Sequence, residues 1–525
     1  MTLEYLRLSK KNDFLLDFSL IIYIHTMKRF SLLDEQKPHF RRACARIDKY
    51  GFYADNSAIG CGKTYVACAT AKNLGLPLFI VCPLAVQSKW NAVAKEADVK
   101  ILFITTPQSL ASKRDLQPKH GYLKRADRKG CPPIFTPTSL LEDVVSEGTF
   151  FVFDEIQFAR NINTYFLACK AITACVGLFE STEIATPSRC AFISTTPFDA
   201  KGKCLNFLGL INLIKDVGMK SKQGLESEMV EDLEYFCSTY GPKVSNVPKT
   251  TSELYTFFIS HLQPKLFTSM PLILEKGCDV RNGFYTIHKE EEKEALMAAI
   301  AYLNSIFMRI DPETRRIPLN VVKRLTLARL RIEKAKVALF ERLVKQELKE
   351  AKRKVVLCLH FQDSIDSLSE ALKAFEPLVL TGKTKYKDRK KIIDSFQKPN
   401  ASKRLLICNL RVGGVGISLH DLDGSYPRTM LLSPDHNVTD LFQATGRVNR
   451  VGGKSESRIR IVYANLPSCE RSILNAIARK MQTIKETLDA SVKGVLKLPN
   501  DFEDYVESGK RLYEEKKEQV VKIEA

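Results

Sequence analysis

Apolar segments recur along the chain between polar and glycine-containing ones, a pattern that predicts buried strands alternating with helices. Residues 150–153 are apolar at every position, and such a continuous run is typical of a strand buried on both faces of a parallel sheet. Comparable segments predict strands near residues 78–82, 101–105, 191–194, 355–359, 405–408, 429–432 and 459–463. The chain is therefore expected to be an α/β protein.

The region between these two groups of strands has a helical pattern instead. Residues 213–353 begin with a polar stretch and then become strongly helical in pattern. Apolar side chains repeat there at helical spacing, at Ile332, Ala335, Leu339, Phe340, Leu343 and Val344. We interpret this stripe as a packing face, in a core or between domains, rather than as a cofactor site.

A glycine-containing turn at residues 57–64, S-A-I-G-C-G-K-T, carries the first candidate chemistry. Backbone N–H groups of such a turn can surround a phosphate chain, with Lys63 reaching the β- and γ-phosphates and Thr64 binding Mg²⁺. The loop is completed by Ser57, Gly60 and Gly62. The alternative is a turn that only caps the alanine-rich helix expected at 65–73, although a helix N-terminus is an anion site in either case. We favour a nucleotide site.

An acidic pair follows the apolar run at 150–153, at the carboxyl end of the expected strand, where open α/β sheets bind ligands. Asp154 can hold Mg²⁺ through water, and Glu155 can orient or deprotonate an attacking water. Gln157 is a candidate for contacting the nucleotide or relaying its state. A solvated acidic pair at a strand end is the alternative, which the upstream phosphate-binding loop disfavours.

The string Q-A-T-G-R-V-N-R at 443–450 supplies candidate arginines. On a helix, Arg447 and Arg450 would share a face, and a guanidinium suits the charge that develops on a transferred phosphoryl group. Both lie far along the chain from Lys63, so we expect them on a second domain, with the site assembled between the two. The alternative is a basic helical face that binds only phosphate backbone or solvent.

Together these strings resemble the motifs of superfamily 2 helicase-type ATPases, in particular the Swi/Snf-like branch of DNA translocases. That branch reads D-E-M-G-L-G-K-T, D-E-A-H, S-G-T-P and Q-A-x-G-R-x-x-R-I-G-Q. This chain reads S-A-I-G-C-G-K-T, D-E-I-Q, S-T-T-P and Q-A-T-G-R-V-N-R-V-G-G. Segments at 79–90, 354–361, 380–396 and 405–419 also resemble family motifs. The resemblance implies two RecA-like parallel-sheet lobes with a helical insertion between them.

The resemblance also implies roles for individual residues. It implies that Gln443 is catalytic, like Glu155 and the two arginines. It also implies that Gly416 contacts the nucleotide. Nucleic-acid backbone contacts are implied for Ser88, Lys89, Thr136, Thr138, Arg411, Gly413 and Gly414. For the two threonines, turn capping is an equally good interpretation. The implied cofactors are ATP and Mg²⁺.

Several positions depart from the family pattern. Ser57 and Ala58 replace two acidic residues at the start of the phosphate-binding loop, and His436 replaces a tryptophan. Phe40 stands where the adenine-reading glutamine is expected, with Gln36 nearby, which puts adenine selectivity in doubt. Because the catalytic candidates are all retained, we expect an active ATPase.

The function implied is a nucleic-acid-dependent ATPase that couples hydrolysis to translocation on duplex DNA or to remodelling of DNA complexes. Two alternatives stay open. One is an RNA helicase or transcription-termination ATPase, and the other is a non-hydrolysing nucleic-acid-binding scaffold. Transcription or replication proteins are expected partners. Compact motors of this kind occur in large DNA viruses, which suggests a viral source.

Composition agrees with a nucleic-acid partner. The chain has 80 Lys and Arg against 60 Asp and Glu, a formal net charge of +20, which suits binding to a phosphate backbone. Its 14 cysteines are irregularly spaced, without a C-x-x-C pair, which favours a reducing compartment and neither disulfides nor structural zinc. We expect an intracellular protein without a membrane partner, in the nucleus or cytoplasm or, if viral, at the host-cell replication site or in the virion.

The expected organisation follows from the positions of the motifs. It comprises an N-terminal extension at 1–26, the first lobe at 27–212, the helical insertion or linker at 213–353, the second lobe at 354–490 and a charged tail at 491–525. A signal peptide is disfavoured, since Asp17 interrupts the N-terminal apolar stretch and no A-x-A site follows. For residues 1–26 the choice is between a short accessory helix and upstream sequence before a start at Met27, and we favour the second.

Overall fold

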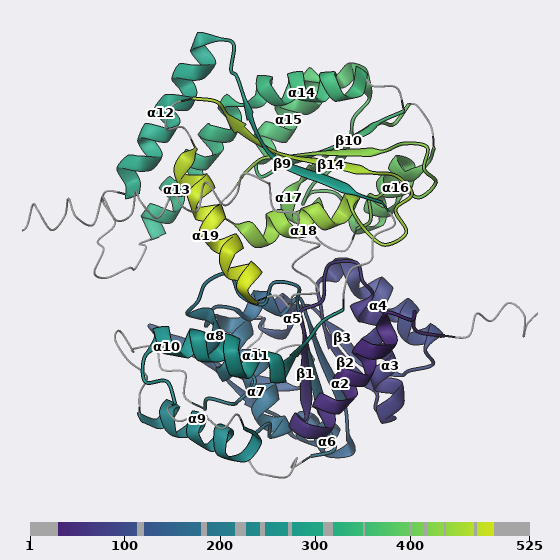
Figure 1. Cartoon of the computed structure of the whole chain (residues 1–525), viewed down its shortest axis with the longest axis vertical. Helices are drawn as coiled ribbons and strands as arrows, with labels where there is room; N and C mark the ends of the chain where they lie inside the picture. The colour runs from purple at the N-terminus through teal and green to yellow at the C-terminus, as the bar shows by residue number, and fades with distance from the viewer. Residues whose placement is uncertain are drawn as a thin grey trace, which may run out of the picture.

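The molecule consists of two α/β lobes stacked along its long axis (Figure 1). This computed structural model describes residues 30–112, 120–179, 186–215, 227–241, 247–270, 276–307, 319–349, 352–399, 402–413, 417–434, 437–466 and 470–487. Each lobe contains a six-stranded sheet in which all neighbouring strands are parallel. The prediction of two RecA-like parallel-sheet lobes is confirmed.

The sheet of the first lobe has the strand order β3-β2-β6-β7-β1-β8. Its strands are β1 (Phe52–Asp55), β2 (Leu78–Val81), β3 (Ile101–Thr105), β6 (Phe150–Asp154), β7 (Arg189–Ile193) and β8 (Phe267–Thr268). In β6, Phe150 and Val152 enter one core while Phe151 and Phe153 enter the other. Burial on both faces therefore explains why this segment is apolar at every position.

Helices cover both faces of this sheet. One face packs against α2 (Gln36–Tyr50), α3 (Lys63–Leu74) and α4 (Leu84–Glu96). The other packs against α6 (Ser139–Glu147), α7 (Thr164–Val176), α8 (Lys203–Leu210), α9 (Ser227–Tyr240) and α10 (Thr251–Phe257). Shorter elements are α5 (Pro107–Leu110), a 3₁₀ turn (Ile156–Ala159), a π-helical turn (Phe258–Leu262), α11 (Gln263–Leu266) and an antiparallel hairpin of β4 (Leu123–Arg128) and β5 (Cys131–Pro137).

The sheet of the second lobe has the order β11-β12-β10-β13-β14-β9. Its strands are β9 (Cys278–Tyr285), β10 (Lys354–Leu359), β11 (Leu378–Leu380), β12 (Leu405–Asn409), β13 (Arg428–Leu432) and β14 (Ser457–Ala464). One face packs against α14 (Val337–Lys349) and α15 (Gln362–Ala371). The other packs against α12 (Glu290–Phe307), α13 (Leu319–Ala335), α16 (Tyr386–Gln397), α18 (Val438–Val448) and α19 (Arg471–Thr487). Two short helices, α17 (Leu410–Gly413) and a 3₁₀ turn (Lys373–Phe375), complete the lobe.

The segment 213–353, expected as a helical insertion, is divided between the two lobes. Phe236 of α9 and Leu254 of α10 are buried in the core of the first lobe, and β8 pairs with β1. After the connection, β9 pairs with β14, while Leu296 of α12 and Ile332 of α13 enter the core of the second lobe. The apolar stripe is thus core packing, because each helix buries its apolar face against the nearer sheet.

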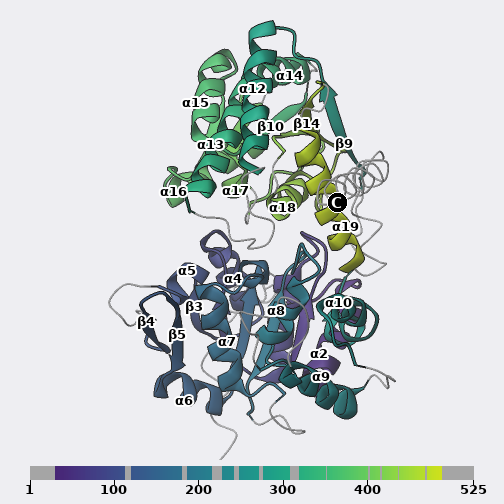
Figure 2. The same ribbon diagram turned by 90° about the vertical axis from the view of Figure 1, so that its left-hand side faces the viewer.

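Among the described residues, two parts of the chain link one lobe to the other. The first is the connection between β8 and β9, and the second is α19. This helix packs Ile473 and Ile477 into the core of the second lobe, and its Glu486 accepts a hydrogen bond of 2.8 Å from the hydroxyl of Tyr255 in α10. Figures 1 and 2 both show α19 running from one lobe to the other.

Some positions singled out in the sequence lie outside the described residues, namely 1–26 with Met27, 491–525, Gly414, Gly416 and His436. Within the described ranges, no helix combines the length and the apolar character needed to cross a membrane.

Candidate active site

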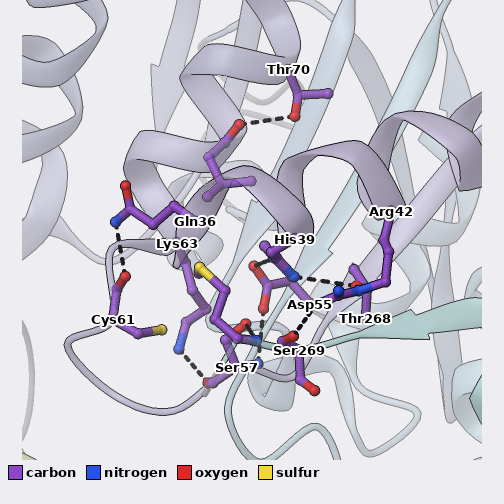
Figure 3. Close-up of polar contacts among 12 residues, drawn as sticks. Gln36, His39, Arg42, Asp55, Ser57, Cys61, Lys63, Thr70, Thr268 and Ser269 are labelled. Atoms are coloured by element: carbon purple, nitrogen blue, oxygen red, sulfur yellow. Dashed lines mark hydrogen bonds and ion pairs between the residues drawn. The ribbon is translucent and has the colours of Figure 1, made fainter. Parts of the chain in front are cut away.

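The phosphate-binding loop joins β1 to α3, which begins at Lys63. Gly60 and Gly62 have φ angles of +86° and +95°, in the region that side chains rarely adopt. A Cβ at Gly62 would also lie 2.2 Å from Nε2 of Gln36. That amide donates to the carbonyl of Cys61 at 3.0 Å (Figure 3). The loop therefore requires glycine at both positions and is held from α2.

Lys63 lies inside this loop. Its ammonium donates to the carbonyls of Ser57 (2.8 Å) and Ala58 (3.1 Å) and to the hydroxyl of Thr195 (2.7 Å). Thr195 comes from the S-T-T-P string that follows β7, so two strand ends converge on one cation. A phosphate oxygen is a stronger acceptor than a carbonyl because it is charged. Lys63 can therefore exchange these contacts for a nucleotide.

Asp154 and Glu155 lie at the carboxyl end of β6, as predicted. Trp90 donates through Nε1 to Oδ2 of Asp154 at 2.9 Å. Burial, together with the neighbouring Glu155, raises the pKa of Asp154 to about 6. Such a carboxyl gains from a cation that offsets its charge. The role of Trp90 was not predicted, since residues so far apart in sequence carry no signal of their contact.

Glu155 has a left-handed backbone with φ of 57°, uncommon for a residue other than glycine. Its Oε2 accepts hydrogen bonds from the amides of Gln157 (2.5 Å) and of Gln443 (2.8 Å). Gln157 is itself held by Ser194, whose hydroxyl donates to Oε1 at 2.5 Å. The Glu155 carboxylate is therefore fixed by amides from both lobes, and strained backbone of this kind is concentrated at functional sites.

Arg447 and Arg450 do not share a helical face, because α18 ends at Val448 and Arg450 lies beyond the helix. Their side chains nevertheless converge, since both donate to the carbonyl of Ile417, at 3.4 and 3.2 Å. Arg450 also donates to the hydroxyl of Ser418 at 2.5 Å. Burial, with Arg450 adding to it, lowers the pKa of Arg447 to about 10, which leaves the guanidinium charged at neutral pH.

The second lobe lies directly against the phosphate-binding loop. A Cβ at Gly60 would be 3.0 Å from Nε of Arg450, and one at Gly446 would be 2.7 Å from Ile59. Farther along α18, Thr439 accepts a hydrogen bond of 2.8 Å from Arg160 of the first lobe. The lobes are therefore closed on each other at the site, with the predicted catalytic arginines beside the predicted phosphate cradle.

The site contains the kinds of groups that bind ATP and Mg²⁺, namely N–H donors, an ammonium and oxygen ligands. Positive-φ glycines and the N-terminus of α3 present N–H groups to phosphates, and Lys63 supplies a cation. The buried Thr64 hydroxyl and the Asp154 carboxylate are oxygen ligands of the kind that Mg²⁺ takes.

The predicted nucleic-acid contacts are more dispersed. Ser88 and Lys89 are exposed on α4. Although the Lys89 side chain as a whole is exposed, its ammonium lies over the Tyr65 ring and is desolvated there, which together with the nearby Arg450 lowers the pKa of Lys89 to about 8. Lys89 is thus also a neighbour of the nucleotide site. Its role in nucleic-acid binding stays a prediction.

The remaining contacts lie on both lobes. Thr138 caps α6 through the N–H of Leu141 and donates to the carbonyl of Gly121 at 2.7 Å, which is the capping alternative. Thr136 is exposed on β5. In the second lobe, Arg411 pairs with Asp440 at 3.2 Å, and Gly413 ends α17. Arg411 is thereby attached to α18, the helix that carries Gln443 and Arg447.

Comparisons with known proteins agree with this geometry. The helicase conserved C-terminal domain matches residues 335–452. A protein of Acanthamoeba polyphaga mimivirus, named as a candidate ATP-dependent RNA helicase, is 25% identical over 475 residues, covering 88% of this chain and 84% of that protein. An ISWI chromatin-remodelling complex ATPase of Saccharomyces cerevisiae is 24% identical over 294 residues, covering 54% of this chain.

The chain spans only 24% of that yeast protein. Among solved structures, the Sulfolobus solfataricus SWI2/SNF2 ATPase core in complex with dsDNA is similar at 14% identity and a TM-score of 0.29, over 87% of this chain and 97% of that one. With the phosphate-binding loop, the acidic pair and the arginines in one site, the sequence relationships have a structural counterpart. The chain is thus similar over most of its length to a viral protein named as a helicase, and over residues 335–452 to the helicase conserved C-terminal domain.

Proposed function

We propose that this protein is a nucleic-acid-dependent ATPase that couples ATP hydrolysis to translocation on duplex DNA or to remodelling of DNA complexes. The observation that carries the proposal is the assembly of one site from two lobes. Glu155 of the first lobe is bonded to Gln443 of the second, and Arg450 lies against the phosphate-binding loop. A site built in this way is complete only when the lobes are closed.

In the proposed reaction the loop binds the phosphate chain of ATP. Lys63 exchanges the carbonyls of Ser57 and Ala58 for phosphate oxygens, and the N–H groups at the start of α3 supply further donors. Mg²⁺ held by Thr64 and Asp154 would offset the phosphate charge and orient the chain. These contacts come from the first lobe, so nucleotide can bind before the lobes close.

Hydrolysis requires residues of both lobes. Glu155, with its carboxylate fixed by Gln157, orients the attacking water and accepts its proton. Arg447 and Arg450 are placed to offset the charge that develops on the γ-phosphoryl group. Since these groups meet only in the closed arrangement, any ligand that favours closure also accelerates turnover.

Nucleic acid is the ligand proposed to favour closure. The net charge of +20 suits a polyanion, and Ser88, Thr136 and Arg411 offer polar groups on the two lobes. Related proteins include a chromatin-remodelling ATPase and a DNA repair and recombination protein of yeast, which favours duplex DNA. Transcription or replication proteins of the same cell are the proposed partners.

One experiment distinguishes the proposal from its alternatives. Phosphate release is measured with duplex DNA, single-stranded DNA and RNA in parallel, with Lys63→Ala as the control for contaminating ATPases. We expect duplex DNA to stimulate most, with log affinity falling against log salt by about 0.9 per phosphate contact. Greater stimulation by RNA would favour the RNA-helicase or transcription-termination alternative, which the name of the mimivirus relative suggests. Binding of nucleic acid without turnover would favour the scaffold alternative.

A further inference from the structure

A buried polar network lies beneath the phosphate-binding loop (Figure 3). Oδ1 of Asp55 accepts the backbone N–H of Ser57, the first residue of the loop, at 2.8 Å. Oδ2 of the same carboxylate lies 3.0 Å from Nε2 of His39. The side chains of both His39 and Asp55 are fully buried. Because a carboxylate only accepts hydrogen bonds, Nε2 carries the proton of this pair.

The other nitrogen of His39 reaches the edge strand β8. Nδ1 lies 3.2 Å from the hydroxyl of Thr268, and Arg42 donates through Nε to the same hydroxyl at 3.2 Å. Thr268 is also the register partner of Asp55 across the β1–β8 pair. His39 therefore bridges two neighbouring strands, one of which leads into the phosphate-binding loop.

Strand β8 leads into the connection to the second lobe. The N–H of Met270 donates to the hydroxyl of Ser57 at 2.8 Å, and Arg42 donates to the carbonyl of Ser269 at 2.8 Å. Ser57 therefore contacts its surroundings through different groups. Its hydroxyl accepts from the connection, its N–H donates to Asp55, and its carbonyl accepts from Lys63. One loop residue joins the phosphate cradle to the start of the interlobe connection.

The charge of Asp55 is stabilised by its neighbours. Burial alone would raise the pKa of this carboxyl, but His39 and Lys63 more than offset burial, so that the pKa lies below its usual value. An ionised acceptor forms a stronger hydrogen bond to Ser57 than a neutral one would. Such a network is expected to fix the loop in a single arrangement.

We propose that His39, Asp55 and Thr268 form a positioning unit that holds the phosphate-binding loop in its nucleotide-binding arrangement and ties it to the interlobe connection. The inference rests on the proposed ATPase function. None of the three residues touches the reacting atoms. They act on the conformation of the loop that binds the phosphate chain. They should therefore stabilise the substrate complex and the transition state to the same extent.

The test compares Thr268→Val with Thr70→Val. Thr70 is also fully buried, and its hydroxyl donates to the carbonyl of Val66 within α3 rather than to the network. Thr268→Val should raise the KM and the Kd for Mg·ATP roughly tenfold, the loss expected for one well-made hydrogen bond. Its kcat should change by less than about twofold, since uniform binding is lost. Thr70→Val should leave both constants near those of the unmodified protein.

Three further variants test whether the residues act as a unit. Thr268→Ser keeps the hydroxyl and should restore the KM. Asp55→Asn should raise the KM by itself. The KM of Asp55→Asn/Thr268→Val should be no higher than that of Asp55→Asn, because the first substitution already breaks the chain of contacts to which Thr268 belongs. The positioning role would be overturned if the effects of Asp55→Asn and Thr268→Val on the KM multiplied in the double variant. It would also be overturned if folded Thr268→Val and Thr70→Val had the same KM. An unmodified protein that neither binds nor hydrolyses ATP would instead overturn the proposed function.

Discussion

Gln443 of the second lobe donates its side-chain amide to the carboxylate of Glu155 in the first lobe, at 2.8 Å. The proposed general base is thus oriented by a residue on the far side of the lobe interface. Under the proposed function this contact would couple the Glu155 carboxylate to closure, because the carboxylate would lose one of its donors if the lobes separated.

The first prediction concerns this contact. Gln443→Glu places a second carboxylate against Glu155, and the like charges disfavour the closed arrangement. We expect kcat with nucleic acid to fall by about tenfold or more, with nucleotide affinity nearly unchanged, since the phosphate cradle lies on the other lobe. Gln362→Glu, whose amide bonds to Asp366 within α15, is the matched control. Equal losses in the two variants would contradict a role in closure.

The second prediction separates chemistry from binding. Glu155→Gln retains the shape of the side chain but cannot accept a proton, so kcat should fall by about a hundredfold or more while Mg·ATP still binds. Nucleotide binding and single-turnover hydrolysis are measured on the same preparation. A kcat close to that of the unmodified protein would mean that another group activates the water.

The third prediction concerns Lys63. Lys63→Ala removes the cation of the phosphate cradle, so nucleotide binding itself should be lost. Its ammonium bonds to Ser57, Ala58 and Thr195, and therefore a fall in thermal stability can accompany the change. Calorimetric titration with Mg·ATP below the melting temperature checks the binding. Retained affinity in folded Lys63→Ala would contradict the assignment of the loop.

The fourth prediction concerns Arg450. Arg450→Ala should lower kcat by about a thousandfold, the lower end of the range for an arginine that stabilises a phosphoryl-transfer transition state. Nucleotide affinity should change far less, because the guanidinium acts only when the lobes close. Arg281→Ala, an exposed arginine on the edge strand β9, serves as the control. Equal losses in kcat and in affinity would indicate a structural role instead.

The fifth prediction is a dependence of stability on pH. Burial, with Arg450 and Arg428 adding to it and Asp421 opposing, lowers the pKa of His420 to about 4. Between about pH 6.5 and pH 4 the unfolded chain binds a proton at this imidazole that the folded chain does not. Stability should therefore fall as the pH drops through that window, by up to about 3 kcal/mol.

His420→Gln tests the source of this loss. Glutamine does not titrate, so urea unfolding between pH 7 and pH 4.5 should show a smaller acid loss in the variant than in the unmodified protein. Parallel stability curves for the two proteins would show that other groups cause the acid sensitivity.

Much of the site follows from local sequence, because its chemistry is carried by short strings at strand ends. The glycines around Lys63 and the acidic pair after β6 are recognisable without a structure, since strand, turn and helix are contiguous there. The contact of Trp90 with Asp154 could not be foreseen in the same way. It depends on how α4 packs against the sheet, which no local pattern specifies.

The edges of the sheets were equally hard to foresee. The two residues of β8 are too few to give a period, and their strand character depends on pairing with β1. Asp55 was a signal that could have been used, since a carboxylate at the end of the buried strand F-Y-A-D needs a partner. That partner, His39, lies on α2, and the bridge to Thr268 spans 229 positions of the chain.

The two links described between the lobes have a mechanical consequence. A body attached at two separate points can turn about the line that joins them but cannot swing freely in other directions. The β8–β9 connection and the Tyr255–Glu486 contact at the end of α19 are two such points. If the lobes open as the proposed function requires, two such points would restrict the motion to rotation about one line, and each closure would return Arg450 to its place against Gly60.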